Sequence, residues 1–163
     1  KISVIGGEKV GATFILTFPP GKLGHTSPHN SEEVAEAINI KLKGKALVVD
    51  DEENILDILE NQLKSFGLEV TTAHDGLEAL NKLKSETYDF VLTDITMPHM
   101  DGITLIQESQ KLSHLKNTKY LTISEILSEA SDQYKNLHTD GHIQKPFSKE
   151  TLRKALADLS SKK

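Results

Sequence analysis

Short apolar runs rich in β-branched residues alternate with segments of helical period from Lys45 to the end of the chain. This alternation is the sequence form of a parallel sheet whose strands are joined by crossover helices. We expect strands at 46–49, 69–73, 90–93, 119–123 and 142–144, and helices at 54–66, 76–84, 103–112, 126–137 and 149–159. The sequence therefore predicts an α/β fold with a doubly wound, five-stranded parallel sheet of order 2-1-3-4-5.

The first 44 residues follow a different pattern. Residues 2–5 and 13–18 are β-prone runs on either side of the connection GGEKVG, which predicts a hairpin. The stretch PPGKLGHTSPHN at 19–30 is dense in Pro, Gly, Ser and Asn and predicts a linker. The segment NSEEVAEAINIKL that begins at Asn30 favours a short helix and an acidic tether about equally. We therefore divide the chain into a hairpin at 1–20, a linker at 21–44 and a domain at 45–163.

Composition excludes several classes of function. The chain holds 24 acidic and 19 basic side chains, and its net charge of -5 argues against a broad cationic surface for nucleic acid or anionic lipid. With no cysteine, disulfides, thiolate zinc sites and a cysteine nucleophile are excluded. No apolar run approaches the roughly 18 residues needed to cross a bilayer. The first residue is Lys1 and no apolar signal-peptide region follows it, so we expect an excised fragment from a cytoplasmic part of its parent.

Acidic residues stand at the carboxyl ends of two predicted strands. Asp50 and Asp51 follow the run ALVV, and Asp94 follows FVLT. In an open α/β sheet the carboxyl edge is where ligands bind, and the order 2-1-3-4-5 brings the first and third strands together. Three adjacent carboxylates repel one another unless a hard divalent cation lies between them. The sequence therefore predicts a Mg2+ site at this edge.

Two further residue types project from the same edge. Lys145 follows the fifth predicted strand, and its ammonium would neutralise an anion bound beside the metal. Thr122 and Ser124 stand at the end of the fourth strand, where a hydroxyl could donate to that anion. Both hydroxyls remain candidates on position alone.

The motifs VVDDEEN, VLTDITMPHMDG, TIS and IQKPF, in this order and at these separations, resemble the receiver domain of two-component signalling. The resemblance covers about residues 44–160 and implies the flavodoxin-like receiver fold. It implies that Asp94 is the phosphoacceptor, that Mg2+ is held by Asp51, Asp94 and the backbone carbonyl of Thr96, and that Asp50 acts mainly through a water on the metal. Lys145 would pair with the phosphoryl oxygens, and the Lys145–Pro146 peptide would be cis.

The resemblance does not by itself decide between the hydroxyls of Thr122 and Ser124. Counting forward from Asp94 favours Ser124, whereas counting back from Lys145 falls between Thr122 and Ser124. We choose Ser124, because Leu121 and Ile123 then alternate with it along the strand. The next residue, Glu125, occupies a position where the family usually has a small residue, and it adds negative charge near an anion site.

The N-terminal hairpin has a resemblance of its own. Residues Gly11 to Phe14, GATF, are similar to the start of the last strand in a histidine-kinase ATP-binding domain. A hairpin of that domain, a linker and a receiver follow one another in hybrid sensor kinases. Because the nucleotide-binding glycine motifs are missing, this fragment is not expected to bind ATP or to act as a kinase. The implied partners are the phosphohistidine domain of the kinase and a histidine phosphotransfer domain.

The histidine phosphotransfer domain would dock on the first helix of the receiver. The apolar residues proposed for the docking patch are Ile55, Ile58 and Leu59, and their surface exposure decides which of them can serve.

Two alternative functions remain open from the sequence. A haloacid-dehalogenase-like phosphatase also uses an Asp nucleophile, Mg2+ and a distant Lys, but it needs a second Asp two residues after the nucleophile, where this chain has Thr96. The other alternative is an interaction module of receiver fold that does not depend on phosphorylation, for which Glu125 is the only support. Turnover of p-nitrophenyl phosphate would indicate the phosphatase.

Overall fold

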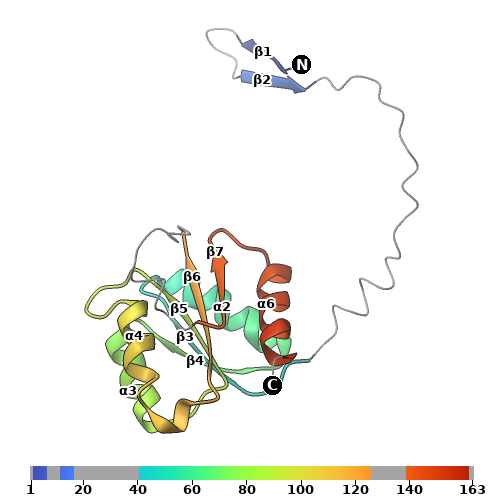
Figure 1. Ribbon diagram of the computed structural model, residues 1–163. Helices are drawn as coiled ribbons and strands as arrows, with labels where there is room; N and C mark the ends of the chain where they lie inside the picture. Colours follow the sequence, from blue (N-terminus) through green and yellow to red (C-terminus); the bar gives the residue numbers. More distant parts are fainter. Residues whose placement is uncertain (1, 7–11, 17–40, 126–138, 162–163) are drawn as a thin grey trace. The chain divides into compact units, whose positions relative to one another are not determined.

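The computed structural model describes residues 2–6, 12–16, 41–125 and 139–161, and the chain divides into two compact units, Lys1–Glu36 and Ala37–Lys163. In the first unit, β1 (Ile2–Gly6) pairs antiparallel with β2 (Ala12–Leu16) (Figure 1). The register joins Ile2 to Leu16, so the predicted hairpin is present within these residues. The final residues of its predicted second strand, 17 and 18, lie outside the described residues.

The second unit contains the predicted parallel sheet. Its strands are β3 (Lys45–Val49), β4 (Glu69–Ala73), β5 (Phe90–Asp94), β6 (Lys119–Ser124) and β7 (Gly141–Gln144). They are hydrogen-bonded in the order β4-β3-β5-β6-β7, and every pair is parallel. The predicted order 2-1-3-4-5 is therefore confirmed, and the carboxyl ends of β3 and β5 are neighbours.

Helices cover both faces of this sheet (Figure 1). They are α2 (Glu53–Phe66), α3 (Gly76–Ser85), α4 (Gly102–Ser109) and α6 (Lys149–Ser161), with a 3-10 turn η1 at Ser113–Leu115. The helix predicted at 126–137 lies outside the described residues. Among the described residues, no helix is both long and apolar enough to cross a membrane.

Alternation along each strand divides the core into two layers. Val48 and Leu92 pack with Leu63 of α2 and Leu156 of α6 on one face. On the other face, residues such as Leu47, Val91, Leu83 and Leu105 pack between the sheet and helices α3 and α4. If a strand slipped by one residue against its neighbour, each of its side chains would move to the opposite layer. The alternation of side chains between the two layers therefore fixes the strand register.

Helix α4 ends earlier than the apolar pattern of its sequence predicts. The pattern extends to Leu112, but the helix ends at Ser109, whose hydroxyl donates to the Ile106 carbonyl at 2.9 Å. The amide of Leu112 then bonds the Ser109 carbonyl at 3.0 Å, a three-residue step that tightens the backbone toward the 3-10 turn. The apolar residues beyond the helix serve that turn, where Leu115 is buried.

The packed unit begins before the first strand. Leu42, which falls in the predicted linker, is 4% exposed, and its amide donates to the Phe66 carbonyl at 2.9 Å. Gly67, which ends α2, has a φ of 103°, a left-handed conformation that glycine adopts at little cost. Leu42 therefore belongs to the core of the second unit together with the end of α2.

Candidate functional site

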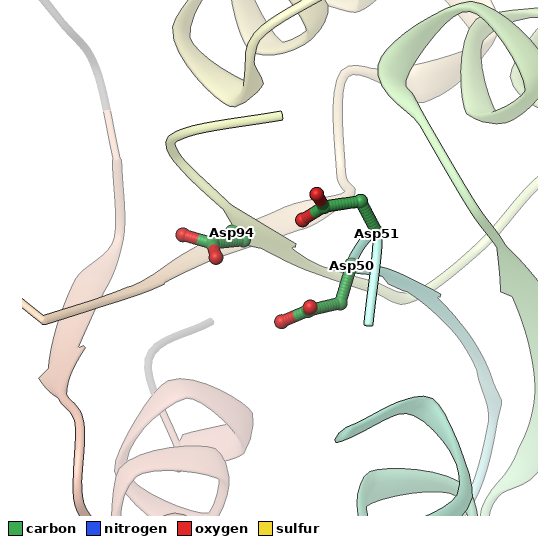
Figure 2. Close-up of side chains that lie close together, drawn as sticks. All are labelled: Asp50, Asp51 and Asp94. Carbon is green, nitrogen blue, oxygen red and sulfur yellow. The ribbon is translucent and has the colours of Figure 1, made fainter. Parts of the chain in front are cut away.

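Parallel pairing brings the three predicted acidic residues together. Val49 is paired with Thr93, so Asp50 and Asp94 follow at the same level of the two neighbouring strands. One carboxylate oxygen from each of Asp50, Asp51 and Asp94 can be chosen so that all three lie within 4.8 Å of one another. Figure 2 shows these side chains gathered where β3 and β5 end. The sheet topology therefore produces the carboxylate cluster that the sequence predicts.

Asp50 is the most deeply buried member of the cluster. It is 1% exposed, and its oxygens accept hydrogen bonds from the Glu52 amide at 3.0 Å and the Lys145 ammonium at 2.8 Å. Burial raises the pKa of Asp50, and the two donors offset only part of that effect. An ionised carboxylate in this position therefore gains from any additional positive charge.

Lys145, which follows β7 near the end of the chain, contacts the carboxylates at the ends of both β3 and β5. Its Nζ lies 2.8 Å from an oxygen of Asp50 and 2.9 Å from an oxygen of Asp94, and its side chain is 11% exposed. Burial lowers the pKa of Lys145, but the hydrogen bonds to the two carboxylates outweigh burial and the net shift is upward. The Lys145–Pro146 peptide is cis, as predicted, and the Lys145 amide donates to the Ser124 carbonyl at 2.7 Å.

Asp94 is held by its own loop and remains reachable. One oxygen accepts the amide of Ile95 at 2.5 Å and that of Thr96 at 3.4 Å, while the other accepts from Lys145. Its side chain is 14% exposed, whereas the neighbouring Asp51 is exposed. A carboxylate that is held in one orientation and remains partly exposed can act as a ligand or as a nucleophile.

These residues suit a hard divalent cation. All three clustered groups are carboxylates, and oxygen is the ligand atom that Mg2+ and Ca2+ prefer. Mg2+ usually keeps several waters and takes few protein carboxylates, and the exposure of Asp51 leaves the cluster open to water. Burial is the main cause of the raised pKa of Asp50, and a bound cation would offset this cost of ionising the carboxyl group.

The two candidate hydroxyls have different surroundings. Thr122 Oγ1 lies 2.9 Å from His142 Nδ1 and 3.4 Å from the Gly141 carbonyl, so it is engaged with β7. Ser124 is the last residue of β6, one position beyond the pairing of Ile123 with Asp94. Leu121 and Ile123 pack in the core layer that α2 and α6 cover, so they alternate along β6 with Thr122 and Ser124. The choice of Ser124 depended on this alternation.

Gly102 is a site residue that we did not single out from the sequence. Its amide donates to the Ile95 carbonyl at 3.0 Å, and a Cβ built on it would lie 2.0 Å from the carbonyl oxygen of Asp94. The start of α4 thus packs directly against the backbone that carries Asp94. The available signal was the pair Asp101–Gly102 at a helix start, since Asp101 caps α4 through the Thr104 amide at 2.7 Å.

We expect Gly102→Ala to impair the site, because the added methyl group cannot fit unless the Asp94 backbone moves. A displacement of about 1 Å in a reacting group can cost roughly 100-fold in rate, so the phosphorylation of Asp94 that the sequence resemblance implies should fall by about that order. Rates of phosphoprotein formation would measure the effect. Gln107→Ala, an exposed change in the same helix, is the control and should leave the rate unchanged.

The sheet of order 2-1-3-4-5, with clustered carboxylates and a lysine at its carboxyl edge, defines the receiver class of α/β domains. The family model for the response regulator receiver domain matches residues 46–157, and the chain belongs to this family. It is therefore a receiver domain of two-component signalling. The predicted fold and the predicted function are confirmed at this level, and nothing in the fold or the comparisons supports the phosphatase or the phosphorylation-independent module.

Individual relatives differ in length and in the functions that their names state. The chain is 38% identical over 117 residues to the probable transcriptional regulator ycf27 of Guillardia theta, covering 71% of this chain and 44% of that protein. It is 30% identical over 112 residues to the autoinducer 2 sensor kinase/phosphatase LuxQ of Vibrio cholerae, covering 69% of this chain and 13% of that protein. The matched region is thus less than half of either relative.

A solved structure agrees with the fold, and its crystals contain Mg2+. The response regulator TrrA of Thermotoga maritima, whose crystal structure is a complex with Mg2+ and BeF, superposes with a TM-score of 0.64 at 32% identity. The alignment covers 71% of this chain and 97% of TrrA.

Proposed function

We propose that this receiver domain accepts a phosphoryl group on Asp94 with the help of Mg2+ held by Asp51, Asp94 and the backbone carbonyl of Thr96, with Asp50 acting mainly through a water on the metal. One observation carries the proposal. Three carboxylates lie within 4.8 Å of one another at the end of a parallel sheet, with the Lys145 ammonium 2.8 Å and 2.9 Å from two of them. The crystal structure of TrrA with Mg2+ and BeF supports the choice of metal.

The reaction needs little from the protein beyond position and charge. The Asp94 oxygen forms a bond to phosphorus as the bond from phosphorus to the donor nitrogen breaks, and the nitrogen leaves with that electron pair. Bound Mg2+ would supply charge neutralisation for the phosphoryl oxygens. Lys145 would neutralise charge on the same oxygens, and its raised pKa keeps it protonated at neutral pH. The Ile95 amide orients the Asp94 carboxylate at 2.5 Å.

Ser124 is the hydroxyl that we propose for the phosphoryl group. Ser124 is 6% exposed at the end of β6, and its carbonyl accepts a hydrogen bond from the Lys145 amide at 2.7 Å. Thr122 is directed to His142 instead. Ser124 would donate a hydrogen bond to a phosphoryl oxygen on Asp94, which would couple the end of β6 to the phosphorylation state.

We further propose a hybrid sensor histidine kinase as the parent protein, with phosphohistidine as the donor and a histidine phosphotransfer domain as the recipient. The similarity to LuxQ supports this assignment, whereas the similarity to ycf27 is equally compatible with a separate response regulator. In this proposal residues 1–20 are the terminal hairpin of the kinase ATP-binding domain, 21–44 are the linker and 45–163 are the receiver. The parent would present this region to the cytoplasm.

The exposed part of α2 is the proposed docking surface for the recipient. Ile58 is 50% exposed, and Ile55 is partly buried against the core. Leu59 is 1% exposed and packs in the core, so its suggested place in the docking patch is wrong. The reason is helical geometry, because Leu59 lies on the same face as Leu56 and Leu63.

The test is binding of beryllofluoride, which imitates the acyl phosphate. We expect backbone NMR signals at Asp94, Ser124 and Lys145 to shift when beryllofluoride and Mg2+ are added together, because both are needed to complete the anion site. Beryllofluoride without Mg2+ is the control and should leave these signals in place. Unchanged spectra with both components would contradict the proposed function.

A further inference from the structure

Glu125 lies at the same edge of the sheet as the phosphoacceptor. Asp94 pairs with Ile123 in β6, so Glu125 stands two positions beyond that pair. Its carbonyl accepts the Gln144 side-chain amide at 3.3 Å, and the preceding carbonyl accepts the Lys145 amide at 2.7 Å. These bonds hold the backbone of Glu125 close to the site, while its side chain is exposed.

The geometry of β-strands gives an approximate distance between Glu125 and Asp94. Neighbouring strands are about 4.8 Å apart and each residue advances about 3.3 Å, so extending β6 by one residue beyond Ser124 gives a distance of roughly 8 Å between the Cα atoms of Glu125 and Asp94. The Debye length at physiological ionic strength is also about 8 Å. The Glu125 charge is therefore close enough to act on an approaching phosphoryl donor, and salt should weaken its action.

Glu125 adds charge where the site already has an excess of carboxylates. Asp50, Asp51 and Asp94 cluster at this edge, and the Lys145 ammonium pairs with Asp50 and Asp94. Within the part of the chain that the structure describes, no ion pair involves Glu125. Its carboxylate thus leaves the edge more repulsive to anions than phosphoryl transfer itself requires.

We propose that Glu125 selects the phosphoryl donor by charge, disfavouring dianionic acyl phosphates relative to donors whose phosphoryl group is bonded to a protonated nitrogen. The inference rests on the proposed phosphorylation of Asp94. With acetyl phosphate, the P–O bond breaks and acetate leaves with the electron pair. With phosphoramidate, the P–N bond breaks and the protonated nitrogen leaves as ammonia. Both reactions form the same Asp94 acyl phosphate, but the first donor carries one more negative charge.

The experiment compares these two donors on Glu125→Gln, which removes the charge and keeps the shape. At about 8 Å in water, the loss of one negative charge should raise the rate with acetyl phosphate about sixfold and the rate with phosphoramidate between about twofold and threefold at low ionic strength. Both gains should disappear near 1 M salt, where the Debye length is about 3 Å. Phosphoprotein formation with Mg2+ can be followed by mass spectrometry.

Glu69→Gln is the matched control, because Glu69 is an exposed glutamate that begins β4 at the opposite edge of the sheet. It changes the net charge equally and should leave both rates as in the wild type. Equal gains with the two donors, gains that persist in high salt, or the same gains in Glu69→Gln would overturn the role of Glu125 alone. A wild-type protein that accepts phosphate from neither donor would overturn the proposed function, and this inference with it.

Discussion

Replacing Asp94 with asparagine is expected to reduce acyl phosphate formation to background. The amide has no ionised oxygen to attack phosphorus, and it also removes one of the clustered carboxylates. The variant should still fold, because asparagine has nearly the same shape and the edge keeps the pairing of Lys145 with Asp50. Incubation with Mg2+ and either acetyl phosphate or phosphoramidate, followed by intact-mass measurement, would detect the added phosphoryl group.

Asp57→Asn provides the matched control. Asp57 is an exposed aspartate on α2, so this change alters the net charge by the same amount away from the site. It should be phosphorylated at the wild-type rate. Undiminished phosphorylation of Asp94→Asn would show that another residue is the acceptor and would remove the proposed role of Asp94.

The largest effect on stability is expected for Leu92→Ala. Leu92 is fully buried in β5, the central strand of the sheet, and packs in the layer that α2 and α6 cover. Truncating a buried leucine removes apolar contacts and leaves a cavity that the sheet cannot close. The free energy of unfolding should fall by about 2–5 kcal/mol. Urea denaturation monitored by circular dichroism would measure the change.

Leu77→Ala is the corresponding surface change, since Leu77 is 50% exposed on α3. Its effect on the free energy of unfolding should stay within about 0.5 kcal/mol. If Leu92→Ala cost no more than Leu77→Ala, the position of Leu92 in the core would be wrong, and so would the layer division described above.

Most of the fold could be predicted because its signals are local and periodic. Alternating or continuous apolar runs located all five strands of the sheet to within one residue at their ends. The end of α4 could not be predicted, since its apolar pattern continues into a 3-10 turn that buries Leu115. A periodic pattern shows that residues are buried, but it does not show which kind of helix buries them.

The candidate site was predicted to a similar depth. Asp50, Asp51, Asp94 and Lys145 stand where strand ends and sheet order would place them, and the structure brings them together. Their roles in catalysis and metal binding remain predictions. Gly102 was missed, because the Asp101–Gly102 pair indicates a helix start but not the close approach of Gly102 to the Asp94 carbonyl.

The sequence alone determined the layered α/β architecture and the positions of the acidic residues along it, because strand period and chain order restrict the possible topologies. Only the tertiary structure decided which side chains meet. Lys145 contacts carboxylates 51 and 95 residues away, Thr122 is engaged by β7, and Leu59 is buried rather than exposed. Such contacts depend on how strands and helices from distant segments pack together, and side-chain packing acts over a few ångströms in space, whatever the separation along the chain.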